Sequence, residues 1–162
     1  MGRNRDQGRQ QNTPSLPVNQ QAIWSIITED RPETLVTTAK TLAAHLVQID
    51  LTTSQIRTLF TAARQLQTNW LRPRETESEE TTRKRQAARR QFVLLKPKLA
   101  YQARRTPAVQ PLADWLDVAI DTVAQAESDL EEYYRFSRFM EFFEAVLAYH
   151  TALGGKQEQR SR

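Results

Sequence analysis

Residues 129–153 read DLEEYYRFSRFMEFFEAVLAYHTAL and contain neither proline nor glycine. Phe136, Phe139, Phe143 and Val146 recur at intervals of three and four residues, which is the spacing of one face of an α-helix. Gly154 follows at the position where glycine commonly closes a helix. A helix of about 25 residues would be about 37 Å long, since each residue adds 1.5 Å. This stretch therefore predicts a long aromatic helix that spans the whole domain.

Upstream of that helix, apolar residues recur with the same period in every segment between the two ends of the chain. Helices are predicted over about 19–28, 32–49, 52–70, 78–105 and 112–123. Thr52 and Gln55 form a capping box at the start of the third of these. No glycine occurs between Arg9 and Leu153, and the turns of β-sandwiches and of phosphate-binding loops need residues with positive φ. The sequence therefore predicts an all-α fold, a compact helical bundle of about five to six helices.

The chain has 162 residues, a length that suits one domain with a real core. We expect a single helical domain over 19–155. Residues 1–18 are polar, carry Arg3, Arg5 and Arg9, and predict a disordered basic tail. The polar residues 72–80 predict a mobile loop, and residues 156–162 a frayed tail.

The composition argues against several classes of function. Cysteine is absent and only His45 and His150 could supply imidazole ligands, so the sequence offers no metal set with the usual spacing. No serine lies on a glycine elbow. We therefore expect no enzymatic activity, no metal and no cofactor. No segment has the apolar length of a signal sequence or a membrane span, so we expect a cytoplasmic protein without a membrane partner.

Charge is segregated along the chain, which has a net charge of +4. Residues 114–132 contain seven acidic residues and no lysine or arginine, whereas residues 83–105 contain nine basic residues and no acidic one. Such polarity suits a protein that contacts a polyanion on one side and a basic neighbour on the other. Self-association of basic side to acidic side is the alternative.

The most basic segment is residues 94–105, LLKPKLAYQARR, with Lys96, Lys98, Arg104 and Arg105. Surface helices usually alternate the sign of their charges, so a run of one sign indicates an anionic ligand such as nucleic-acid phosphate. A solvated cationic face is the alternative, and these residues alone leave it open. Pro97 lies within the predicted helix, where proline costs about 3 kcal/mol, and therefore predicts a kink or break.

Three motifs in order resemble the small subunit of type III-A CRISPR effector complexes, the Csm small subunit. They are LTTSQIRTLF at 51–60, LLKPKLAYQARR at 94–105 and FMEFFEAVLAYHTALGG at 139–155. The residues that match the family pattern are Thr53, Ser54, Gln55, Ile56, Arg57, Leu95, Lys96, Lys98, Leu99, Ala100, Tyr101, Arg105, Glu144, Ala145, Ala148, Tyr149 and His150. Arg104 stands where the family usually has glycine.

The resemblance implies a non-catalytic helical protein that stacks in several copies as a minor filament of the effector complex. It implies as partners the guide RNA, the target RNA, the other subunits and further copies of the chain, as a filament or a dimer. The RNA-binding residues are then expected to be Arg57, Arg64, Lys96, Lys98, Arg104 and Arg105, with Arg85, Arg89, Tyr101 and Arg138 as secondary candidates. The alternative is a protein-protein assembly module that does not contact RNA.

Overall fold

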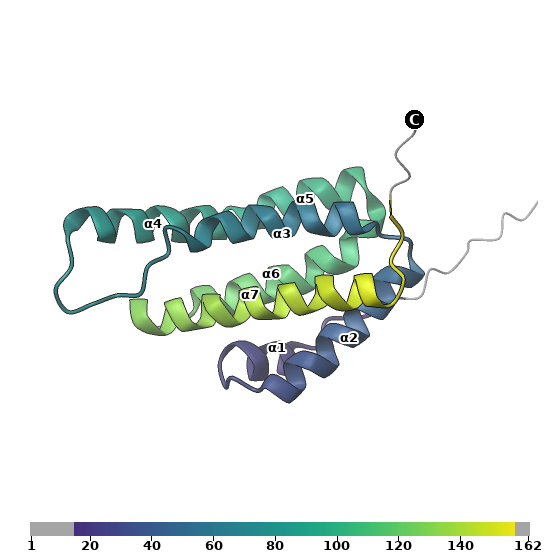
Figure 1. Ribbon diagram of the computed structural model, residues 1–162, viewed down its shortest axis with the longest axis horizontal. Coiled ribbons are helices and arrows are strands. Elements are labelled where there is room, and N and C mark those ends of the chain that lie inside the picture. Colours follow the sequence, from purple (N-terminus) through teal and green to yellow (C-terminus); the bar gives the residue numbers. More distant parts are fainter. Residues whose placement is uncertain (1–14, 158–162) are drawn as a thin grey trace, which may run out of the picture.

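The computed structural model describes residues 15–157 (Figure 1). This part of the chain contains α-helices and one short 3-10 helix, and no strand. Their bounds are α1 (Gln20–Ile27), α2 (Pro32–Gln48), α3 (Thr53–Gln67), α4 (Glu79–Val93), α5 (Leu95–Arg105), η1 (Pro107–Val109), α6 (Gln110–Ala124) and α7 (Asp129–Ala152). The predicted all-α fold is confirmed.

Local signals in the sequence set the ends of these helices as predicted. The Thr52 hydroxyl accepts a hydrogen bond from the Gln55 amide at 3.2 Å, and the Gln55 side chain accepts one from the Thr52 amide at 2.9 Å. Pro32 occupies the first turn of α2, where backbone N–H groups have no acceptor within the helix, so proline, which lacks an N–H, is tolerated there. Gly154 follows α7 with φ of +82°, a left-handed conformation that suits glycine.

The long aromatic helix that the sequence predicted is α7, which lies in the middle of the bundle (Figure 1). In that view α3, α4 and α5 lie above α6 and α7, and α1 and α2 lie below them. Helix α7 packs against α2, α3, α6 and α1. Its Phe139 and Phe143 are 1% exposed, and Phe143 meets Phe60 of α3 edge to face. The aromatic face of α7 is therefore core.

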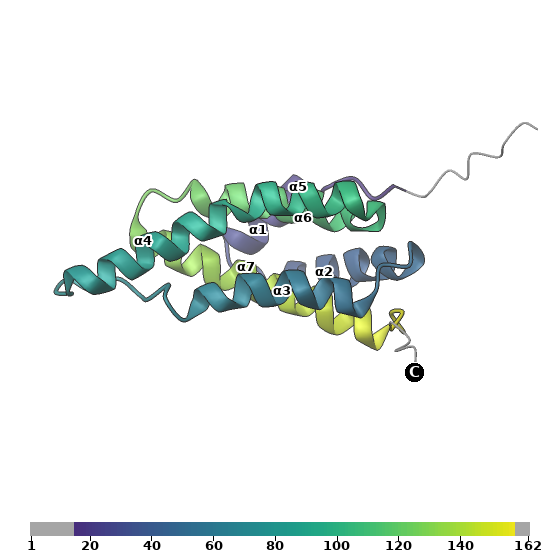
Figure 2. The same ribbon diagram turned by 90° about the horizontal axis from the view of Figure 1, so that it is seen from above.

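The helix expected over 78–105 is two helices, with the break at Leu94 rather than at Pro97. The backbone at Leu94 has ψ of −5°, and its amide still bonds to the Arg90 carbonyl. Pro97 is the third residue of α5, so its missing N–H is one of those that every helix leaves unpaired at its start. The bend directs α5 away from α3 while α4 stays packed against α3 (Figure 2).

The expected tails fall largely outside the described residues, namely 1–14 and 158–162. Within the described part, Leu16 and Val18 pack against the core, and the Leu16 carbonyl accepts a hydrogen bond from Trp115 at 3.4 Å. The segment expected as a mobile loop, 72–80, contains the Glu77 carboxylate, which binds Arg85 of α4. Its mobility and the single-domain division over 19–155 remain proposals. No helix among the described residues is long and apolar enough to cross a membrane.

Candidate nucleic-acid interface

Helix α5 presents a stripe of cations and one tyrosine to solvent. Lys98, Tyr101 and Arg105 are three and four residues apart, so they lie on one side of the helix. Tyr101 is 58% exposed, the largest fraction among the exposed large hydrophobic side chains of residues 15–157. The Arg105 guanidinium lies 5.7 Å from the centre of the Tyr101 ring and 3.4 Å from its hydroxyl oxygen. This stacking orients Arg105 while leaving its charge accessible.

Lys96, which the sequence grouped with these cations, lies on a different side of α5. Its ammonium donates to the Asp121 carboxylate at 2.6 Å and lies 3.6 Å from Asp117, both on α6. The hydrogen bond to Asp121 raises the pKa of Lys96. The anionic partner of Lys96 is therefore within the chain, whereas the one-sign run of charges had indicated an anionic ligand outside it.

The basic run and the acidic run meet inside the molecule, which corrects the expectation that each faces a different neighbour. Besides Lys96, Arg89 of α4 pairs with Glu132 of α7 at 2.8 Å. Burial raises the pKa of Glu132 despite the Arg89 guanidinium beside it. Arg85 lies 3.8 Å from Asp129. Much of the charge segregation in the sequence therefore serves contacts between α4 or α5 and α6 or α7.

Two further secondary candidates are also engaged within the fold. Arg85 is 6% exposed and binds both carboxylate oxygens of Glu77. Its hydrogen bond lowers the pKa of Glu77 from 4.5 to about 2. Arg138 donates to the backbone carbonyl of Ile27 at 3.0 Å and lies 3.6 Å from Asp30. These arginines hold the loop before α4 and the turn after α1.

Arg57 and Arg64 are exposed on α3 but face away from α5. Arg57 is two residues from Leu59, and Arg64 is two residues from Ala62; Leu59 and Ala62 both face α5. On an α-helix, residues two positions apart are separated by a rotation of about 160°, so they point to opposite sides. The Arg64 guanidinium lies 6.0 Å from the Phe60 ring centre. The structure therefore places the predicted cations in separate groups, one on α5 and one on the far flank of α3.

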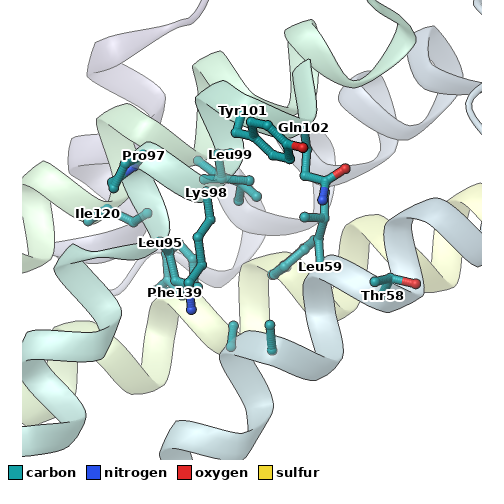
Figure 3. Close-up of a pocket in the computed structure, with 14 residues that line it drawn as sticks. Thr58, Leu59, Leu95, Pro97, Lys98, Leu99, Tyr101, Gln102, Ile120 and Phe139 are labelled. Carbon is teal, nitrogen blue, oxygen red and sulfur yellow. The ribbon is translucent and has the colours of Figure 1, made fainter. Parts of the chain in front are cut away.

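An apolar groove of about 380 Å³ separates α3 from α5 (Figure 3). Leu59 lies on its α3 side and Lys98 on its α5 side (Figure 3), and the buried Phe139 and Phe143 of α7 also line it. A second hollow of about 200 Å³, lined by Ser54, Gln55 and others, shares Thr58, Leu59 and Gln102 with it. Sequence reasoning missed this groove, because the bend at Leu94 that opens it carries no local signal of its own.

The first and third sequence motifs meet at His150. This side chain is fully buried, and its Nε2 donates to the Leu51 carbonyl at 2.7 Å. Its Nδ1 lies 3.3 Å from the Thr53 hydroxyl, and the Thr53 amide donates to the Lys156 carbonyl. A Cβ at Gly155 would lie 2.1 Å from the His150 ring. His150 therefore fastens the end of α7 to the start of α3.

The described residues contain no group of three histidine or acidic side chains that could hold a metal ion. A protein-family model described as Csm2 Type III-A matches residues 29–156. No curated protein and no solved structure matches the chain.

Proposed function

The chain belongs to the Csm2 family of type III-A systems, whose members are small subunits of the CRISPR effector (Csm) complex, and we propose that it holds RNA there through α5. In this proposal Lys98, Arg104 and Arg105 contact phosphates of the guide-target RNA without reading bases. Lysine and arginine on phosphates position a strand but carry no sequence information.

One observation carries the assignment to these three residues. Lys98, Arg104 and Arg105 are exposed and form no ion pair within residues 15–157, whereas Lys96, Arg89 and Arg85 pair with carboxylates. A phosphate contact contributes its full binding free energy only when the cation has no carboxylate partner within the fold. A paired cation must first break its ion pair, which offsets part of that free energy. We accordingly assign Lys96, Arg85, Arg89 and Arg138 to the fold.

Arg57 and Arg64 are proposed as a second row of phosphate contacts. Both are exposed, form no ion pair within the described part of the chain, and stand seven residues apart on α3. Tyr101 is proposed to shape the α5 row by stacking against Arg105. Stacking of copies as a minor filament in antiviral defence is proposed from the family alone.

Ultraviolet crosslinking of the assembled effector complex to target RNA, followed by mass spectrometry of this subunit, tests the proposal. We expect adducts on peptides from α5, with Tyr101 the most reactive side chain, and none on α2. The matched control is a complex carrying Lys98→Ala, Arg104→Ala and Arg105→Ala, in which the α5 adducts should disappear. Adducts confined to the other subunits would instead favour an assembly module without RNA contact.

A further inference from the structure

We propose that the groove between α3 and α5 is a docking site for an acidic amphipathic helix of a partner protein. The proposal goes beyond the RNA contacts, because the groove beside Lys98 is lined mainly by apolar side chains, which cannot bind a phosphate backbone. Leu59 and Ala62 line it on α3, Leu95 and Leu99 on α5, and Phe139 and Phe143 on α7. Apolar side chains are therefore the chemistry that it accepts.

The dimensions of the groove match two turns of a guest helix. On α5 its lining runs from Leu95 to Gln102, seven residues apart, which corresponds to about 10 Å at 1.5 Å per residue. Side chains at positions i, i+3 or i+4, and i+7 of a guest helix cover the same length. The volume of about 380 Å³ lies within the range of binding clefts.

Charge determines which helix fits. Lys98 is the one charged residue among those that line the groove, and Arg105 lies on the same stripe of α5. No acidic side chain of the described residues lines either this groove or the adjoining hollow that contains Ser54 and Gln102. A guest helix with carboxylates beside its apolar face would meet Lys98 and Arg105, where it would compete with the proposed RNA phosphates, whereas a basic helix would be repelled.

The test uses the full chain and two synthetic helical peptides that share leucines at i, i+3 and i+7. One carries glutamates beside the leucines, and the other carries lysines at the same positions. Binding of each fluorescent peptide is measured by anisotropy. We expect the glutamate peptide to bind about fivefold more tightly, since one exposed charge pair contributes up to about 1 kcal/mol.

Matched variants then locate the binding. Ala62→Phe fills the groove and should reduce the affinity for the glutamate peptide at least about tenfold, since the peptide's leucines lose their apolar partners. Thr61→Phe, at the next residue, which is exposed and does not line the groove, should leave the affinity unchanged. Lys98→Glu should remove the preference for the glutamate peptide, since the new carboxylate offsets the charge of Arg105. Circular dichroism and thermal unfolding verify that each variant folds.

Several results would overturn the proposal: no peptide binding, equal affinity for both peptides, or binding that Ala62→Phe leaves intact. Self-association of the chain that Ala62→Phe abolishes, without peptide binding, would identify a second copy as the occupant. RNA binding that Ala62→Phe abolishes would identify a nucleobase. We expect RNA binding to survive Ala62→Phe, so failure of this proposal is distinguishable from failure of the RNA proposal.

Discussion

The Lys96 ammonium lies 2.6 Å from the Asp121 carboxylate. Lys98, only two residues away in the most basic segment of the chain, forms no ion pair within residues 15–157. The two lysines point to different sides of α5, one to α6 and the other to the groove. Neighbouring cations of one motif therefore have different roles, and the difference is visible only in the tertiary structure.

Lys96→Ala and Lys98→Ala should separate these roles. Lys96→Ala is expected to reduce the free energy of unfolding by up to about 1 kcal/mol, because the ion pair is partly exposed, and to leave RNA affinity unchanged. Lys98→Ala should reduce RNA affinity and leave the free energy of unfolding unchanged. Urea unfolding and RNA binding of each variant are the measurements, and a double-mutant cycle with Asp121→Ala assigns the loss to the pair. An equal loss of RNA affinity in both variants would contradict the division.

Pro97→Ala should change the free energy of unfolding by no more than about 0.5 kcal/mol. Pro97 lies in the first turn of α5, where a backbone N–H has no acceptor within the helix, so its ring removes no helical hydrogen bond. The sequence alone suggested a cost of about 3 kcal/mol for this proline. Ala100→Pro, three residues later on the exposed side of the same helix, is the control and should cost at least about 3 kcal/mol. Chemical unfolding of both variants measures the difference, and a large stabilisation by Pro97→Ala would show that proline strains the bend.

His150→Ala should destabilise the protein by about 2–4 kcal/mol, since it leaves a cavity and removes the donor to the buried Leu51 carbonyl. His45→Ala is the control: His45 is also buried, but its Nε2 has no hydrogen-bond partner among residues 15–157, so less is lost. Thermal unfolding compares the two. Equal losses would mean that the contacts of His150 with Leu51 and Thr53 contribute nothing beyond packing.

Acid should weaken the attachment of the loop before α4. Because Arg85 lowers the pKa of Glu77 from 4.5 to about 2, the folded state favours the carboxylate form. The resulting stability is fully present above about pH 4.5 and is lost as the pH falls toward 2. The free energy of unfolding of Glu77→Gln should therefore vary less with pH in this window than that of the unaltered chain.

Glu132→Gln is the opposing control for that experiment. Burial raises the pKa of Glu132, so protonation favours the folded state and its contribution grows as the pH falls toward 4.5. Glu132→Gln should therefore steepen the loss of stability just above pH 4.5. If both variants change the slope in the same direction, the assignment of these carboxyl groups is wrong.

The sequence predicted most of the fold because its signals were local. The aromatic period of α7, the Thr52–Gln55 capping box and Gly154 each determine one element through neighbours a few residues away, and all three are confirmed. The position of the bend was missed, since nothing adjacent distinguishes Leu94 from the residues around it. There the backbone conformation follows from packing of α4 and α5 onto other helices.

The candidate site was harder to predict because it depends on which charges meet. Arg89 and Glu132 are 43 residues apart, and Lys96 and Asp121 are 25 apart. The spacing of residues along the chain does not indicate such long-range ion pairs. Cations that are paired within the fold therefore could not be distinguished in the sequence from cations that are accessible. The groove between α3 and α5 has the same origin, since it depends on the angle between two helices.

The salt dependence of RNA binding tests the central claim most directly. Binding of single-stranded RNA to the full chain, alone and in the assembled complex, is measured over a series of salt concentrations. Lys98→Ala, Arg104→Ala and Arg105→Ala together should reduce the slope of log affinity against log salt by about 2, since each phosphate contact contributes about 0.7 for single strands. The control, Lys40→Ala, Arg83→Ala and Lys84→Ala, removes the same charge from exposed positions elsewhere and should leave the slope nearly unchanged. Equal slopes for the two triple variants would contradict the assignment of RNA contacts to α5.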